Sequence, residues 1–399
     1  MEQITESQAR RRLFALAAAF VFIYIGAGAQ QQYVVPYFTQ TLGWSDVYAG
    51  LAVAAVYIGE TATRVVNLAL VAGWADSLLS FVGSLTYVLF PFVVGLTYYT
   101  HSFPLLLAAG LLWGWGGSCF WTGSSMQTLR YGDALRGSRH GLSTGILYLA
   151  THLGFFSGVV LLGVIHAHLR ETPHALFFVA AALTAVGSII LFGIPRTGGA
   201  VAEPLTWASV REVASRVKVK VASFLMLMSG VAFGTMLGPF AAYVEGEFGK
   251  NWLWITAAFF PIARMLVALS AGIAADYISA DILMTGAFGF AAVGLAVVPA
   301  WDSPWAMALA AFALGLLQGT IPVVATAMVG QSAERKRRAL PHAIIFSFRD
   351  IGVTAAVMTA LVTHHKIGDF APVFRAFAAV FAVCGLVSLA LRRHAHERL

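Results

Sequence analysis

Two segments decide the fold, RVVNLALVAGWAD (residues 64–76) and RMLVALSAGIAAD (residues 264–276), because they repeat one pattern at an offset of 200 residues. In each segment an arginine precedes an aspartate by twelve residues. Such spacing, shared by two distant parts of one chain, is the signature of an internal repeat. The chain is therefore expected to contain two related halves.

Two further matches follow in the same order in both halves. GLLWG at residues 110–114 matches GLLQG at 315–319, and ATHLGFF at 150–156 matches FRDIGVT at 348–354. The last match places His152 opposite Asp350. One match is compatible with chance, whereas three in the same order predict a duplicated unit of six helices.

Composition gives the class of protein. The chain has 399 residues, of which 59% are hydrophobic and only 11% are charged, with a mean hydropathy of +0.79. These values exclude a water-soluble domain and predict an all-α, polytopic membrane protein. Runs of about 20 apolar residues give twelve expected spans, at 13–38, 46–74, 78–99, 104–128, 143–166, 175–194, 221–243, 252–275, 282–300, 304–330, 341–363 and 371–391.

The first span has a competing interpretation, because a basic start, an apolar core and small residues near Ala27 and Ala29 are also typical of a signal peptide. Cleavage there would leave eleven spans and remove the symmetry of the two halves. The N-terminus of the mature protein distinguishes the two interpretations.

Lysine and arginine are distributed unevenly between the two sides of the membrane. The termini and the loops on their side hold 18 of these residues, and the opposite loops hold four. Because basic loops stay in the cytoplasm, both termini are expected to be cytoplasmic, in a multi-pass protein of the cell membrane. This bias also accounts for the isoelectric point near 9.5, so we expect no nucleic-acid partner. The remaining three of the 25, Arg64, Arg264 and Arg349, lie inside spans.

The longest polar interval, residues 195–220, separates a first bundle at 1–194 from a second at 221–399. Ser209 and Glu212 have the spacing of a capping box and predict a short amphipathic helix there, on the cytoplasmic surface. A solvated linker is the alternative interpretation.

These features resemble the major facilitator superfamily of secondary transporters: twelve spans in two halves, a central cytoplasmic loop, and GIAAD at residues 272–276. The resemblance implies two pseudo-symmetric six-helix bundles with a substrate site at mid-membrane depth between them. The sequence departs from the family where GWADSLLS lacks basic residues and where Gly110 replaces a common arginine. The mode of coupling therefore stays open between symport, antiport and uniport.

Six ionisable side chains share the expected mid-membrane layer: Glu60, Arg64, His152, Arg264, Arg349 and Asp350. Each charge at that depth costs about 2.5–3.5 kcal/mol on insertion scales, so a function is expected for them. Each also has a structural interpretation. Glu60 and Arg64, four residues apart, neutralise each other, and His152 is a structural hydrogen-bond donor. Arg349 and Asp350 point about 100 degrees apart on a helix and are expected to serve different partners.

The charge of this layer, 3 − 2 = +1, predicts an anionic substrate. Guanidinium groups suit carboxylates, and Arg64 with Arg264 resembles the arginine pair of nitrate and nitrite porters. We expect a small organic anion, with a proton carried by Glu60, Asp350 or His152. The residues expected to bind substrate are Arg64, Arg264, Arg349, Gln30, Tyr33, Trp121 and Gln318, and those expected to gate are Asp76 and Asp276.

No motif predicts an enzyme, a cofactor or a bound metal, and no nucleotide-binding domain is present in the sequence. The expected partners are a small-molecule substrate, protons and the lipid bilayer, and the protein is expected to be a monomer. Two alternatives stay open: a transporter of a zwitterionic or neutral solute, and a non-transporting membrane scaffold or assembly factor with the same fold.

Overall fold

The computed structural model describes residues 4–396 apart from 72, 137–139, 170, 197–204, 278–279 and 333–338. Within helices it leaves the side chains of 140–141, 269–277, 280–281, 327–332 and 390–396 undescribed. The secondary structure of the described residues is helical throughout. The first part of the chain forms α1 (Glu6–Ile23), η1 (Tyr24–Gly28), α2 (Ala29–Pro36), η2 (Tyr37–Thr41), α3 (Asp46–Arg64), α4 (Asn67–Leu70), α5 (Asp76–Thr100), α6 (Phe103–Ala134), α7 (His140–His168) and α8 (Ala175–Phe192).

The second part follows a short helix, α9 (Trp207–Ser215). Its elements are α10 (Val217–Thr235), η3 (Met236–Phe240), α11 (Ala241–Phe248), α12 (Lys250–Tyr277), α13 (Ala280–Val297), η4 (Val298–Ala300), α14 (Pro304–Ser332), α15 (Ala339–Ile367) and α16 (Ala371–His396). The segments η1, η2 and η3 are π-helical turns inside longer helices. Pro239 lies inside η3 and lacks a backbone N–H donor, which accounts for the local change of helical geometry there.

Eleven helices in the described part of the chain are long and apolar enough to cross a membrane. The expected second span is the exception, because its helix ends at Arg64 and not near residue 74. A turn at Val65 and Val66 separates α3 from the single turn of α4. Two successive β-branched residues have low helix propensity, which favours the break at this point.

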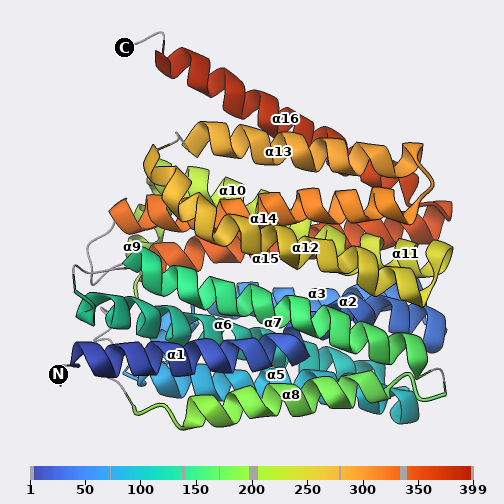
Figure 1. The fold of residues 1–399 in the computed structure, drawn as a ribbon, viewed down its shortest axis with the longest axis horizontal. Coiled ribbons are helices and arrows are strands. Elements are labelled where there is room, and N and C mark those ends of the chain that lie inside the picture. The colour runs from blue at the N-terminus through green and yellow to red at the C-terminus, as the bar shows by residue number, and fades with distance from the viewer. Residues whose placement is uncertain are drawn as a thin grey trace.

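Figure 1 shows α1 to α8 on one side of the molecule and α10 to α16 on the other, with both termini at the same end. We call these groups the first half and the second half. The end that holds both termini is the terminal end, and the opposite end, where α3 begins and α15 ends, is the distal end. All the long helices run between the two ends (Figure 1).

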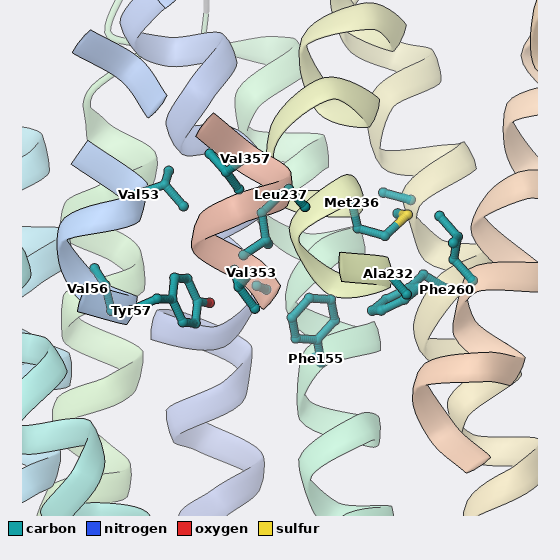
Figure 2. Close-up of a cluster of buried hydrophobic side chains, with 14 of the residues drawn as sticks. Val53, Val56, Tyr57, Phe155, Ala232, Met236, Leu237, Phe260, Val353 and Val357 are labelled. Carbon is teal, nitrogen blue, oxygen red and sulfur yellow. The ribbon is translucent and has the colours of Figure 1, made fainter. Parts of the chain in front are cut away.

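The halves meet along two helix pairs, α3 against α15 and α7 against α12. The second pair approaches closely because Gly163 of α7 has no side chain, and a Cβ there would overlap the Cβ of Trp254. Toward the distal end the interface is apolar. Figure 2 shows Val53 of α3, Leu237 of η3 and Val357 of α15 gathered in this layer, and all three are buried.

The short helix between the halves begins earlier than expected. Thr206 is its N-cap: its hydroxyl accepts a hydrogen bond from the backbone of Ser209, whose own hydroxyl accepts one from the backbone of Thr206. The expected cap at Ser209 is therefore wrong. Thr206 has the extended backbone that a cap requires, so it takes the capping position and places Ser209 inside the first turn.

Candidate functional site

Four of the expected mid-membrane charges form one network between α3 and α15. Nε and Nη2 of Arg64 donate to Oδ2 of Asp350 at 2.9 and 2.7 Å, and Arg64 also pairs with Glu60 at 2.5 Å. Arg349 donates to the other oxygen of Asp350, Oδ1, at 2.9 and 2.7 Å, and reaches Glu60 at 3.3 Å. The network is closed: each carboxylate contacts both arginines, and the total charge is zero.

The network is deeply buried, with Arg64 at 1% and Asp350 at 0% exposed. Charge pairs in such a site are stable only when every group is hydrogen-bonded, and the four bonds to Asp350 meet that condition. Arg349 and Asp350 have different partners, as expected, since Arg349 reaches Glu60 and Asp350 binds Arg64, but they also pair with each other, which was not expected. The long side chain of Arg349 bends back toward Asp350. The two side chains therefore pair even though their Cβ atoms point in different directions around the helix.

Arg264 of α12 differs from the other two arginines. It is 9% exposed, its Nε has no hydrogen-bond partner, and among the described residues it forms no ion pair. Its guanidinium lies 5.3–5.9 Å from the ring centroids of Phe155, Phe233 and Phe260. Contacts with aromatic faces stabilise a cation only in part. Arg264 is therefore the site of the unbalanced positive charge.

Two adjoining cavities lie between the halves and share Trp121, Arg264, Gln318 and Arg349. One has an empty volume of about 590 Å³ and is lined mainly by polar and aromatic side chains, including Glu60. The other, of about 410 Å³, adds Tyr148, His152, Ala268, Gly319, Pro322, Val323 and Phe346.

The structure brings together some of the residues expected to bind substrate and separates others. Arg264, Arg349, Trp121 and Gln318 line the cavities, while Arg64 is enclosed in the ion-pair network. Gln30 and Tyr33 are buried on α2, and the Tyr33 hydroxyl donates to the carbonyl oxygen of Val159 on α7.

The residues expected to carry protons or to gate are also distributed unequally. Glu60 and His152 line the cavities, whereas Asp350 is fully enclosed. Asp76 begins α5 and pairs with Arg130 of α6 at 2.6 Å, a contact within the first half. Asp276 lies in α12, but its side chain is outside the described residues.

Sequence reasoning missed several cavity residues, chiefly Tyr24, Gln31, Tyr57, Tyr148, Phe155 and Phe233. Gln31 lines the cavity and accepts a hydrogen bond of 2.5 Å from the Tyr57 hydroxyl, whereas the adjacent Gln30 had been expected there. Tyr57 and Tyr148 precede Glu60 and His152 by about one helical turn. That spacing is a signal that could have identified both tyrosines.

Searches of protein-family models and of curated proteins find no match to this sequence. Solved structures do match. The crystal structure of nucleoside transporter NupG has a TM-score of 0.72 at 12% identity, covering 95% of this chain and 98% of that chain. A point mutant of the same transporter gives 0.74, again at 12% identity, with 95% and 99% coverage.

A third solved structure is a bacterial homologue of the human drug peptide transporters PepT1 and PepT2. It has a TM-score of 0.74 at 12% identity and covers 99% of this chain and all of that chain. All three structures are of transporters and not of enzymes. Because the similarity extends over nearly the whole of each chain, this chain has the all-helical, multi-pass membrane fold of these transporters.

Proposed function

We propose that the protein moves a small organic anion across the cell membrane by alternating access. The observation that supports this most strongly is the isolated charge of Arg264 in a cavity between the halves. A buried charge without a partner is costly. A substrate with one negative charge supplies the missing partner, whereas the network of Glu60, Arg64, Arg349 and Asp350 is already neutral.

The cavity lining favours a carboxylate on an apolar or aromatic body. Arg264 presents a planar fork of donors, which matches the two oxygens of a carboxylate. Trp121, Tyr148 and Phe155 provide apolar and aromatic walls for the rest of the molecule, and Gln318 has a buried side-chain oxygen without a partner. That oxygen is available to accept a hydrogen bond from a polar group of the substrate.

We propose that protons are coupled through the ion-pair network between α3 and α15, and its position between the halves supports this. When the halves move apart, Asp350 loses Arg64 and keeps only Arg349, so the charge of its carboxylate is compensated less and water in the opened cavity can deliver a proton. A proton then neutralises the carboxylate and reduces the desolvation cost. Glu60 and His152 are the other proton carriers that we propose, because both line the cavities.

The terminal end faces the cytoplasm in this proposal, because 18 basic residues lie on that side against four on the other. The distal end then faces outward. The smaller cavity, of about 410 Å³, extends toward the terminal end, since Ala268, Val323 and Phe346 lie on that side of the charged layer along their helices.

A zwitterionic solute is the second candidate, because Glu60 lines the same cavity as Arg264. An ammonium group near Glu60 and a carboxylate near Arg264 would satisfy both side chains. The solved relatives include peptide and nucleoside transporters, so a substrate without net charge is chemically compatible with this fold.

A thermal-shift experiment on detergent-purified protein tests the proposal. The probes are aromatic and aliphatic monocarboxylates, their neutral amides, and amino acids, each measured on the parent and on Arg264→Lys and Arg264→Gln. A ligand at 100 times its dissociation constant stabilises the native state by about 2.7 kcal/mol. We expect a carboxylate, but not its amide, to raise the unfolding temperature of the parent. The same carboxylate should raise the unfolding temperature of Arg264→Lys by less and should leave that of Arg264→Gln unchanged. Stabilisation by amino acids alone would favour the zwitterion.

A further inference from the structure

Two histidine–carboxylate pairs join the halves at the distal end, away from the cavity. Nε2 of His166 on α7 lies 2.8 Å from Oε2 of Glu245 on α11. Nδ1 of His364 on α15 lies 2.8 Å from Oδ2 of Asp46 on α3. Each pair therefore links one residue of the first half to one residue of the second half.

The histidines of the two pairs are related by the internal repeat. His364 follows His166 by 198 residues, the same offset that aligns His152 with Asp350. Glu245 follows Asp46 by 199 residues. The two histidines thus occupy equivalent positions, whereas the acids lie on different elements: Asp46 begins α3, and Glu245 lies in α11, before α12, the counterpart of α3. In both pairs a histidine of one half contacts an acid of the other half.

The surroundings make both pairs part of the closed interface. His166 is fully buried, Glu245 is 4% exposed, and the ring of Tyr33 lies 5.4 Å from that of His166. The His364 ring is stacked on the ring of Phe370, beside the start of α16, with 3.8 Å between the ring centroids. Closer to the cavity lies the apolar layer that includes Leu237 (Figure 2).

We propose that His166–Glu245 and His364–Asp46 form the gate at the distal end of the transport path. Opening the cavity on this side separates α3 from α15 and α7 from α11, so both pairs must break. While they are intact, the cavity communicates only with the terminal end. This inference rests on the proposed alternating-access function, and it adds four residues to the transport cycle that do not touch the substrate.

The polarity of these pairs suits a gate. In the closed state the buried side chains of His166 and Glu245 each satisfy one polar atom of the other, which penalises partial opening. In the open state water solvates both groups, so the pair can break reversibly. An apolar contact alone would lack this dependence on a specific partner.

Cysteine labelling measures the opening directly. Leu237→Cys, in a Cys119→Ser and Cys384→Ser background, places the reporter in the apolar layer, where Leu237 is 0% exposed. The protein is held in nanodiscs and treated with a soluble maleimide without substrate. The labelling rate then reports the fraction of molecules that are open at the distal end.

Matched variants separate a gate from a general effect. His166→Ala and His364→Ala each remove one pair, and each is expected to raise the labelling rate about five- to tenfold, from the usual value of one hydrogen bond. His168→Ala and His365→Ala alter exposed histidines on the same helices and are expected to label at the parental rate. His166→Gln and His364→Asn keep an amide donor near the position of the bonded ring nitrogen. Both variants are therefore expected to label at close to the parental rate.

Equal labelling of the parent and of both alanine variants would overturn the proposal, as would an equal increase in the His168 and His365 controls. If His166→Ala fails to fold, His364→Ala decides the question, since that side chain is 28% exposed and tolerates loss more easily. The assay uses no substrate. Faster labelling of the alanine variants without anion binding by the parent would therefore support the gate and reject the proposed substrate. Anion binding by the parent without faster labelling of the variants would support the substrate and reject the gate.

Discussion

Asp350→Asn removes one charge from a network in which every group is paired. Asp350 accepts four hydrogen bonds of 2.7–2.9 Å from two arginines and is fully buried. After the substitution, Arg64 and Arg349 share only Glu60, and the network carries a charge of 2 − 1 = +1. Removing one partner of a buried pair typically costs about 3–5 kcal/mol. The ratio of folded to unfolded protein should fall by roughly 150- to 5,000-fold.

The double variant Asp350→Asn with Arg64→Gln is the matched control, because it leaves Arg349 and Glu60 as one neutral pair. We expect the double variant to lose less stability than the sum of the two single variants, with a coupling of about 1–3 kcal/mol. Unfolding temperature in detergent and loss of monodisperse protein on heating both report the change. If the single variant is as stable as the parent, or if the two losses simply add, the closed network does not stabilise the structure as described.

Two further predictions concern the interface and the proton. Gly163→Ala places a Cβ against that of Trp254 and should hinder closure of the distal end, so the Leu237→Cys reporter should label faster. The control is Gly145→Ala on the same helix, where the added Cβ meets open space. Equal labelling rates for the two variants would contradict the close-packing argument. Asp350→Asn protein that folds should exchange substrate between loaded compartments but should not accumulate it under a pH gradient, because the amide mimics a carboxyl that is always protonated. Accumulation at the parental level would move the proton to Glu60 or His152.

The helical architecture was predictable because its signals are long and repeated. Apolar runs of about 20 residues and three internal matches specify the spans and their pairing. The end of α3 at Arg64 was not predicted, since an apolar run continues through Val65 and Val66 and only local backbone geometry stops the helix.

The site was predictable only in part. Depth along the spans identified the six ionisable residues, because charge in a membrane is rare and costly. Their pairing depends on side-chain direction and on the distance between two halves that are far apart in sequence. For that reason Arg64, Arg264 and Arg349 were all expected to bind substrate, whereas the structure leaves Arg264 alone without a carboxylate among the described residues.

The symmetric histidines were in the sequence but carried no visible signal. His166 and His364 sit near the ends of expected spans, where an isolated histidine is ordinary. Only the folded arrangement shows that each faces an acid of the other half. The offset of 198 residues becomes informative once those contacts are known.

Isothermal titration of the best-binding monocarboxylate to the parent, Arg264→Lys and Arg264→Gln tests the central claim most directly. Charge-assisted hydrogen bonds of this kind contribute about 1.5–3 kcal/mol, so Arg264→Gln should weaken binding roughly 10- to 150-fold. Arg264→Lys should retain part of the affinity, and the neutral amide of the ligand should bind all three proteins weakly and equally. Equal carboxylate affinity for the parent and Arg264→Gln, with both proteins folded, would contradict the assignment of Arg264 as the anion-binding residue.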